Sequence, residues 1–258
     1  MIITKNRDEL DSALEEARLK DLKIGFVPTM GALHEGHLSL IRVAREYSDI
    51  VVVSIFVNPT QFAPHEDFDA YPRHEEEDAE KLREQGVEVL FLPSIDVLYP
   101  SGMESDIKPG SAAEGLETDF RPHFFEGVVN VVHRLFEAVK PDFAVFGEKD
   151  FQQLAVIKEM VQAEDLPVQI IGAPIVRDEH GLALSSRNAY LSPSELEISR
   201  NLNSALKDVS EESDLNETIK TLIEKGFDKI DYVEKRWGRV LAAAWLGKTR
   251  LIDNMQIK

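Results

Sequence analysis

The chain has 258 residues, a formal net charge of −18 and no cysteine. A nucleic-acid-binding surface is basic, so a chain this acidic is a poor candidate for binding nucleic acid, and the lack of cysteine excludes disulfides and thiolate zinc sites. No secretion signal or membrane-spanning run stands out, so we expect a cytoplasmic protein without a membrane partner.

The segment from Pro28 to Leu38 reads PTMGALHEGHL and is the first informative stretch. It follows an apolar run at 24–27 and leads into a helical pattern at 38–47, which predicts a strand, a glycine-bearing turn and a helix N-terminus. Such a turn is typical of an anion site, because free backbone N–H groups and the helix dipole point at it. The imidazoles of His34 and His37 favour a phosphate that undergoes chemistry there.

Three other interpretations of this segment are weaker. Gly31 and Gly36 have the spacing of P-loop glycines, but His and Leu follow where Lys and Ser or Thr are needed, and the run is not a dinucleotide fingerprint. A His-x-x-His pair could bind zinc, yet no third ligand of the right type lies nearby. Two surface histidines at a helix cap are the plainest alternative, which the strand and glycine context disfavours.

Apolar runs alternate with helical patterns further along the chain. A strand buried on both faces is expected at 50–57, and two more strands are expected at 87–92 and 143–146. Helices are expected at 75–85, 128–139 and 151–163. This alternation predicts an α/β fold with a doubly wound, Rossmann-like parallel sheet. Ligands of such sheets bind outside the carboxyl ends of the strands, so the polar runs after the strands should converge there.

Two charged runs lie at predicted helix starts. Gly147 to Asp150 (GEKD) follows a predicted strand, where Lys149 can meet a phosphate and Asp150 can cap the helix or contact a ribose. Taken alone, this run is more typical of a charged turn with an N-cap. The other run, Glu75 to Asp78, is expected to be a solvated helix start rather than a metal site.

Two glutamines follow the same predicted sheet edge. Gln61 lies in the run NPTQF at 58–62, and Gln153 lies in the helix after GEKD. A glutamine that faces the ligand could bind a hydroxyl or a carboxylate, because its amide both donates and accepts. Each one alone is more typical of a surface amide.

The pattern changes near residue 174. A hairpin is expected from 174–177 and 182–184, followed by Ser185, Ser186 and Arg187, which suit phosphate oxygens. A plain helix entry, with a cap downstream at Ser192, is the alternative. Two helices and two strands are expected beyond, at 193–210, 215–226, 230–234 and 240–246. We therefore predict two domains, residues 1–174 and a smaller α+β domain at 175–258.

Together these motifs resemble those of the pantothenate synthetase (pantoate–β-alanine ligase) family along nearly the whole chain. The similar segments are PTMGALHEGH at 28–37, SIFVNPTQF at 54–62, DAYPR at 69–73, FGEKDFQQL at 146–154, LALSSRN at 182–188 and AAWLGKTRLIDN at 243–254. The family belongs to the nucleotidyltransferase superfamily. HEGH at 34–37 looks like the HIGH signature of class I aminoacyl-tRNA synthetases, and LSSR at 184–187 stands where their KMSKS loop would be.

The resemblance implies a reaction in two steps. ATP and pantoate give pantoyl adenylate and pyrophosphate, and β-alanine then gives pantothenate and AMP. The resemblance also implies Mg²⁺, with no metal ligand assigned, and a homodimer. The implied catalytic residues are His34, His37, Lys149 and Arg187, with His37 as the acid that aids the departure of pyrophosphate.

The resemblance further implies which residues line each substrate. The implied ATP site consists of Met30, Gly31, Ala32, Leu33, His34, Glu35, Gly36, His37, Gly147, Glu148, Lys149, Asp150, Val176, Leu184, Ser185, Ser186 and Arg187. Pantoate is expected at Gln61 and Gln153, and β-alanine at Gln61. Asn58 is a further candidate for that pocket.

Two segments depart from the family pattern. The family reads RPGHFxGV where this chain has RPHFFEGV at 121–128, so His123 and Phe124 replace a Gly–His pair. Family members usually carry a helical stretch between the YVE strand and the AAWLG strand, whereas only residues 235–239 intervene here. We therefore predict a direct hairpin with Trp237 and Gly238 near its turn, and a smaller lid over the nucleotide.

Two other functions stay open. Another small-molecule nucleotidyltransferase or adenylate-forming enzyme would share the phosphate motifs without needing Gln61 and Gln153. A non-catalytic nucleotide-binding regulator is disfavoured, because no part of the phosphate motif set is missing. Formation of pantothenate from ATP, pantoate and β-alanine would distinguish the ligase from both.

Overall fold

The computed structural model describes residues 1–62, 68, 71–104 and 107–257, so the first two residues of the DAYPR motif, 69–70, lie outside the described residues. The chain divides into two compact units. The first unit consists of Met1–Glu148 and Gln152–Ala173, and the second of Lys149–Phe151 and Pro174–Lys258. The domain division predicted at residue 175 stays a prediction, since a domain is defined by folding on its own as well as by compactness.

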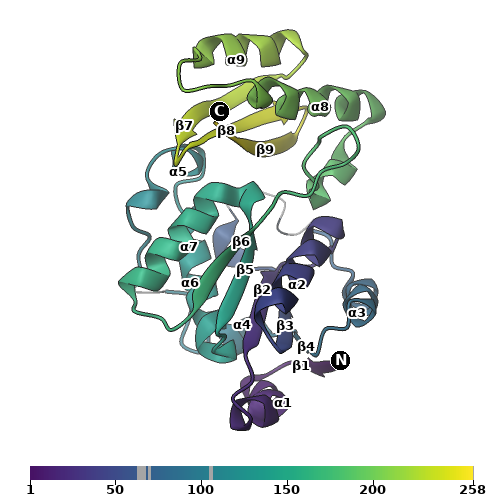
Figure 1. Cartoon of the computed structure of the whole chain (residues 1–258), viewed down its shortest axis with the longest axis vertical. Coiled ribbons are helices and arrows are strands. Elements are labelled where there is room, and N and C mark those ends of the chain that lie inside the picture. The colour runs from purple at the N-terminus through teal and green to yellow at the C-terminus, as the bar shows by residue number, and fades with distance from the viewer. Residues whose placement is uncertain (63–67, 69–70, 105–106, 258) are drawn as a thin grey trace. The chain divides into compact units, whose positions relative to one another are not determined.

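The first unit contains a six-stranded sheet in which all neighbouring strands run parallel (Figure 1). Its order is β1-β4-β3-β2-β5-β6, and the strands are β1 (Ile2–Thr4), β2 (Ile24–Thr29), β3 (Ile50–Ile55), β4 (Val89–Phe91), β5 (Phe143–Gly147) and β6 (Gln169–Ala173). The order reverses between β2 and β5, which is the topological switch point where such sheets bind ligands. The predicted doubly wound parallel sheet is confirmed.

Helices cover both faces of this sheet. α2 (Glu35–Tyr47) and α3 (Glu75–Glu84) bury apolar side chains in one core together with Val27 and Val145. α6 (Phe124–Val139) packs on the opposite face, where Phe136 meets Phe26 and Phe146 with ring centroids 6.2 and 6.3 Å apart. Successive side chains of a strand point to opposite faces, which explains why the strands read as continuous apolar runs.

The other elements before residue 174 connect the strands. They are α1 (Arg7–Leu19), α4 (Ile95–Leu98), α5 (Glu117–Phe120), α7 (Phe151–Ala163) and the 3₁₀ turns η1 (Pro59–Gln61), η2 (Ser111–Ala113) and η3 (Glu148–Asp150). The sequence prediction contained no β1, α1 or β6, and it began α6 at Val128 rather than Phe124. β1 is too short for a periodic pattern, and Gly172 interrupts the pattern of β6. A Cβ at Gly172 would lie 3.0 Å from Leu154 Cδ2, so α7 packs closely against this glycine.

The second unit contains a three-stranded antiparallel sheet, β7-β8-β9, covered on one face by two helices. Its elements are β7 (Lys229–Arg236), β8 (Arg239–Leu246), β9 (Thr249–Gln256), α8 (Pro193–Lys207) and α9 (Leu215–Glu224). Trp237 and Gly238 form the turn between β7 and β8 with φ of 55° and 68°, as in a type I′ hairpin. The predicted direct hairpin is confirmed, whereas β9 was not predicted.

Candidate functional site

His34 and His37 lie at the N-terminus of α2, beyond the carboxyl end of β2. His34 is the N-cap, and its Nδ1 accepts a hydrogen bond from the Gly36 N–H at 3.1 Å. His37 Nδ1 accepts one from the His34 N–H at 3.3 Å, and the ring centroids are 4.1 Å apart. Because each Nδ1 is an acceptor, the neutral form of each ring carries its proton on Nε2. The pair therefore supplies N–H donors at the positive end of the helix dipole.

The backbone amides of the turn before α2 have acceptors within the protein. The Gly31 N–H donates to Thr29 Oγ1 at 3.2 Å. The N–H groups of Ala32 and Leu33 donate to the two carboxylate oxygens of Asp78, each at 2.8 Å. The expectation of free backbone N–H groups is therefore wrong for residues 31–33. For an anion at this turn, the binding groups are the imidazoles and the helix dipole.

Asp78 is the exception in the acidic run at the start of α3. Residues 75–77 are exposed as expected, but Asp78 is fully buried, so the prediction of a solvated run is wrong at this position. A signal was available, because Asp78 shares the buried helix face of Leu82. Lys81 Nζ lies 3.9 Å from an Asp78 oxygen and donates to the Leu33 carbonyl at 2.9 Å.

Asn58 holds the segment that follows β3. Its side chain is 1% exposed, and its Nδ2 donates to the Gly127 carbonyl at 3.1 Å and to Gln61 Oε1 at 3.3 Å. Its Oδ1 accepts from the Tyr99 hydroxyl at 2.8 Å. These bonds connect η1 to α6 and orient the Gln61 amide.

Gln61 and Met30, predicted for different substrates, lie in contact. Gln61 Nε2 is 2.8 Å from Met30 Sδ, so the segments that follow β2 and β3 meet here. The close approach of η1 to α6 depends on Gly127, because a Cβ at that position would overlap the Thr60 carbonyl. The Gln61 amide is held by Asn58 and Met30, whereas no comparable side-chain hydrogen bond is found for Gln153 of α7 among the described residues.

Arg121 connects η1 to residues 121–128, the segment that we expect to depart from the family pattern. Its guanidinium lies 3.8 Å from the centroid of the Phe124 ring and donates to the Gln61 carbonyl at 3.3 Å. Phe124 thus stacks on the arginine that contacts Gln61. His123, the other departing residue, has a side chain that is 89% exposed and lies 3.7 Å from Glu126.

Gly147 ends β5, and Glu148 follows it in η3. Beyond them, Gln152 is buried and serves the fold: its Oε1 accepts from the Glu117 N–H at 3.0 Å, and its Nε2 donates to the Ala112 and Gly115 carbonyls at 3.1 Å. Gln152 thus holds the segment before α5, and this role of Gln152 could not be predicted from the sequence.

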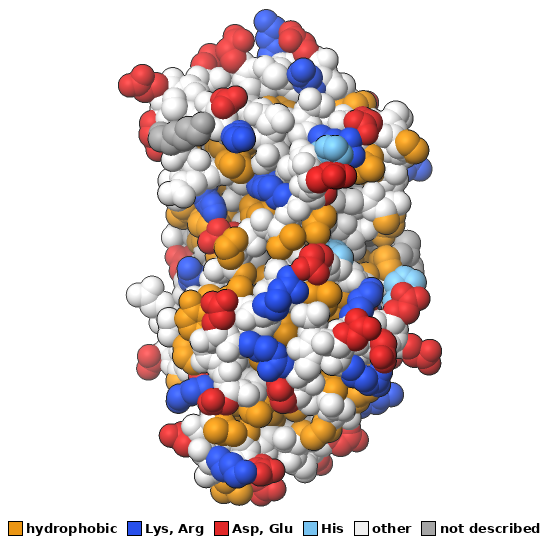
Figure 2. All heavy atoms as spheres, turned by 45° about the vertical axis from the view of Figure 1, so that its right-hand side comes forward, with side chains coloured by type: hydrophobic (Ala, Val, Ile, Leu, Met, Phe, Trp, Pro, Cys, Tyr) orange, Lys and Arg blue, Asp and Glu red, His pale blue; other side chains and the backbone are white. Residues whose placement is uncertain are grey.

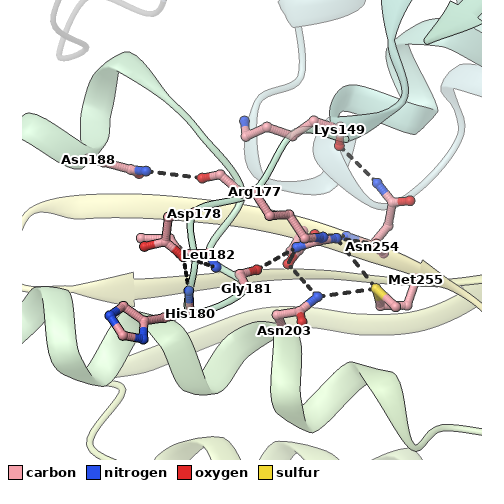
Figure 3. Close-up of polar contacts among 12 residues, drawn as sticks. Lys149, Arg177, Asp178, His180, Gly181, Leu182, Asn188, Asn203, Asn254 and Met255 are labelled. Carbon is pink, nitrogen blue, oxygen red and sulfur yellow. Dashed lines mark hydrogen bonds and ion pairs between the residues drawn. The ribbon is translucent and has the colours of Figure 1, made fainter. Parts of the chain in front are cut away.

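Lys149 and Asp150 belong to η3, and Lys149 clusters with the second unit. Asn254 of β9 donates from Nδ2 to the Lys149 carbonyl at 3.0 Å (Figure 3). Lys149 Nζ lies 3.7 Å from Asp150 Oδ2. The backbone of Lys149 is therefore tied to the C-terminal sheet, a connection that the sequence did not indicate.

The predicted hairpin around residue 180 is confirmed. The Leu184 N–H donates to the Val176 carbonyl at 3.0 Å, and Arg177 and Ala183 form an antiparallel bridge. The Arg177 guanidinium donates two hydrogen bonds, of 2.7 and 2.8 Å, to the buried Asp253 carboxylate. This bidentate pair anchors the hairpin to β9.

The residues after this hairpin form a 3₁₀ turn, η4 (Ser186–Tyr190). Ser185 is its N-cap, and its Oγ accepts from the Arg187 N–H at 3.3 Å. Asn188 Nδ2 donates to the Ala183 carbonyl at 3.0 Å, which holds the turn against the hairpin. Ser192 caps α8 separately, as the helix-entry alternative expected.

The described residues include no cluster of three or more His, Asp or Glu side chains that could hold a metal ion. Likewise, no helix in the described part of the chain is long and apolar enough to cross a membrane. Figure 2 shows acidic and basic side chains interspersed on the face that it draws. Positive charge for an anionic ligand is thus supplied by individual side chains.

The fold and the residues beyond its strands define the class of Rossmann-like α/β proteins. The family described as Pantoate-beta-alanine ligase matches residues 2–256. The chain belongs to this family and is therefore a ligase.

Relatives cover nearly the whole chain. The pantothenate synthetase of Mesorhizobium japonicum is 51% identical over 268 residues, covering 96% of this chain and 95% of that protein. That of Rhodopseudomonas palustris is 46% identical and covers 99% and 98%. A Francisella tularensis pantoate-beta-alanine ligase, solved in complex with Beta-gamma ATP and beta-alanine, has a TM-score of 0.91 at 40% identity, covering 99% and 97%. The Thermus thermophilus pantothenate synthetase has a TM-score of 0.89 at 39% identity, covering 99% of each chain.

Proposed function

We propose that this ligase condenses pantoate with β-alanine through pantoyl adenylate. A pantoate carboxylate oxygen attacks the α-phosphorus of ATP, and the bond to the β-phosphate oxygen breaks to release pyrophosphate. The β-alanine amine then attacks the acyl carbon, a proton leaves the nitrogen, and AMP departs to give pantothenate. The ATP and beta-alanine in the Francisella complex support these substrates.

The observation that carries this proposal is the histidine pair at the positive end of α2. Charge develops on the pyrophosphate oxygens as the α-phosphorus is attacked, and donors fixed at that place lower the barrier. The His34 N–H holds His37 Nδ1, so His37 donates from Nε2. We assign His37 as the acid that aids the departure of pyrophosphate, in that its Nε2–H shares its proton with the leaving oxygens through a hydrogen bond, and His34 as a second donor.

We assign ATP-binding roles to residues of each unit, taken by itself. Among the positive groups of the second unit, we assign Lys149 and Arg187 to stabilising phosphate charge. The Ser185 hydroxyl caps η4, so it acts through the shape of the turn as well as through direct contact. The remaining proposed ATP residues are Met30, Gly31, Ala32, Leu33, Glu35, Gly36, Gly147, Glu148, Asp150, Val176, Leu184 and Ser186.

Gln61 and Gln153 are the proposed pantoate residues, and Gln61 also contacts β-alanine. Their amides can donate to a carboxylate and accept from a hydroxyl, the two groups that pantoate offers. Asn58 is fully bonded within the protein, which favours a role in orienting Gln61 over direct contact with substrate.

Mg²⁺ fits this site as a partner of the phosphates. No cluster of three acidic or histidine side chains is present among residues 1–62, 68, 71–104 and 107–257, and Mg²⁺ commonly binds through substrate phosphates and water. It would neutralise phosphate charge. A homodimer and a cytoplasmic location stay predictions, and light scattering would measure the oligomeric state.

The test of this function is a comparison of products. The protein is incubated with ATP and pantoate, with and without β-alanine. AMP and pantothenate should form together only when both co-substrates are present. Transfer of AMP to another acceptor would indicate a different nucleotidyltransferase, and absence of any turnover would indicate a nucleotide-binding regulator.

Replacing His37 tests its role as the acid. His37→Ala should lower the rate of pyrophosphate release from ATP and pantoate by about 10²–10⁴, the range for a lost general acid. His37→Asn should be similarly slow, although its Oδ1 can still accept the His34 N–H and keep the cap. His74→Ala, at an exposed helix start, is the control and should retain the wild-type rate. A near-normal rate for both His37 variants would contradict the assignment.

A further inference from the structure

We propose that Asp78, balanced by Lys81, is a positioning residue that fixes the turn at 31–33 and thereby places the histidine pair for ATP. This inference rests on the proposed function in that ATP is taken as the ligand of the turn. Among the described residues, Asp78 accepts from the amides of Ala32 and Leu33 and pairs with Lys81, all of which belong to the first unit. It would act through the turn and not on the reacting atoms.

The first observation is the burial of a charged side chain with a specific set of partners. Asp78 has no exposed surface, and its two oxygens accept from the successive N–H groups of Ala32 and Leu33, each at 2.8 Å. A buried carboxylate is costly unless it is hydrogen-bonded and paired. The two amides supply the hydrogen bonds, and Lys81, whose Nζ lies 3.9 Å from Asp78 and donates to the Leu33 carbonyl, supplies the opposite charge.

The second observation is the conformation of the turn that these bonds hold. Gly31 has φ of 85°, and Ala32 has φ of 51°, in the left-handed region that a residue with a Cβ rarely adopts. Strained residues of this kind persist only where surrounding contacts determine them. The Ala32 N–H itself donates to the Asp78 carboxylate, so this hydrogen bond holds Ala32 in its strained conformation.

The third observation is the identity of the anion that accepts from the amides of Ala32 and Leu33. Successive backbone N–H groups form a natural anion-binding concavity. Here the occupant is the protein's own carboxylate, at the switch point of the sheet. At this turn, contact with phosphate is therefore left to the imidazoles of His34 and His37, whose position follows from the turn that Asp78 fixes.

The test compares ATP affinity in Asp78→Asn with that of a control variant in which another carboxylate that accepts from a backbone N–H of this unit is replaced. The isosteric amide cannot accept from both N–H groups in the same way and cannot balance Lys81, so the Kd for ATP measured by calorimetry should rise about 10–100-fold, as for a lost charge-assisted hydrogen bond. The KM for ATP in pyrophosphate release should rise in parallel, with the KM for pantoate changed less than about threefold. Lys81→Met should shift the ATP affinity in the same direction by a smaller factor.

Asp142→Asn is the control. Asp142 accepts from the Ile24 N–H at 2.9 Å at the opposite end of β2 and pairs with Lys23. It should lower the melting temperature without changing the Kd for ATP. Wild-type affinity in both folded Asp78→Asn and Lys81→Met, or equal changes in the affinities for ATP and pantoate, would overturn the inference. The proposed function fails separately, if the wild type binds ATP but forms no pantothenate.

Discussion

Buried polar side chains of the first unit act mainly on the backbone of the segments beyond the strands. Asn58, Asp78 and Gln152 each bond main-chain groups far away in the sequence, and each is almost fully buried. Loop backbones cannot satisfy their own N–H and C=O groups as helices and sheets do, so a side chain must supply the partner. Asn58 and Asp78 therefore hold segments that carry candidate site residues, whereas Gln152 holds the segment before α5.

The stack of Arg121 on Phe124 gives a prediction for a position where we expect the chain to depart from the family pattern. A cation–π contact at a partly exposed site contributes about 0.5–1 kcal/mol. Phe124→Ala should release Arg121 from the Gln61 carbonyl and raise the KM for pantoate about two- to fivefold, measured by steady-state kinetics. His123→Ala, whose side chain is 89% exposed, should stay within twofold of wild type. An unchanged KM in Phe124→Ala would show that the stack does not support Gln61.

The antiparallel sheet of the second unit is joined across its strands by a buried carboxylate. Asp231 lies at an irregularity in β7, between Ile230 and Tyr232, where a bulge can redirect a side chain. Its Oδ2 accepts from Trp245 Nε1 on β8 at 2.9 Å and from Arg250 Nε on β9 at 2.8 Å. One side chain thus connects all three strands.

Asp231 predicts how the second unit responds to acid. Burial raises the pKa of this carboxyl, but the bonds from Arg250, Lys229 and Trp245 outweigh burial and hold the pKa below its ordinary value of 3.8. A carboxyl with a lowered pKa in the folded state stabilises the fold above its unfolded pKa and loses this contribution as the pH falls through the folded value. The free energy of unfolding should therefore drop as the pH is lowered below about 4.

Urea titrations at a series of pH values measure this effect. Asp231→Asn should be less stable near neutral pH and should lose less stability on acidification than the wild type. Glu234→Gln, an exposed change on the same strand, should keep the wild-type dependence. Equal acid dependence in wild type and Asp231→Asn would assign the effect to other groups.

At the scale of the whole molecule, the two units have separate cores. The core of the first unit is built on the parallel sheet, and the core of the second on β7–β9 with α8 and α9. Separate cores allow separate unfolding, because the contacts that make a transition cooperative lie mostly within each unit.

Calorimetry of a core variant tests this separation. Leu222→Ala removes a fully buried side chain of α9 and should destabilise the second unit by about 2–5 kcal/mol. The transition assigned to this unit should move to lower temperature while the other stays in place. Ile223→Ala, next to it and 46% exposed, should move neither transition by as much. A single transition that moves as a whole would show that the units unfold together.

Much of the architecture could be predicted because it is encoded in local patterns. The apolar runs of β3 and β5, the polar runs that follow them and the short connection at Trp237 each predicted an element that the structure contains. The missed elements β1, β6 and β9 carry weak patterns. Two site predictions failed for one reason: Asp78 looked like part of a solvated run, and the amides of Ala32 and Leu33 looked free, because their contact joins residues 45 and 46 positions apart.

The sequence by itself determined the alternation of strands and helices, the histidine pair at a helix N-terminus and the resemblance to one family. Periodicity and helix-start residues are local features, so they can be recognised in the sequence without knowledge of the fold. Only the tertiary structure decided which side chain bonds which backbone: Asp78 with the turn before α2, Arg177 with Asp253, and Asn254 with Lys149. Sequence pattern tells which residues are buried, but a hydrogen bond is specific to a distance and direction, and these arise only when distant segments pack together.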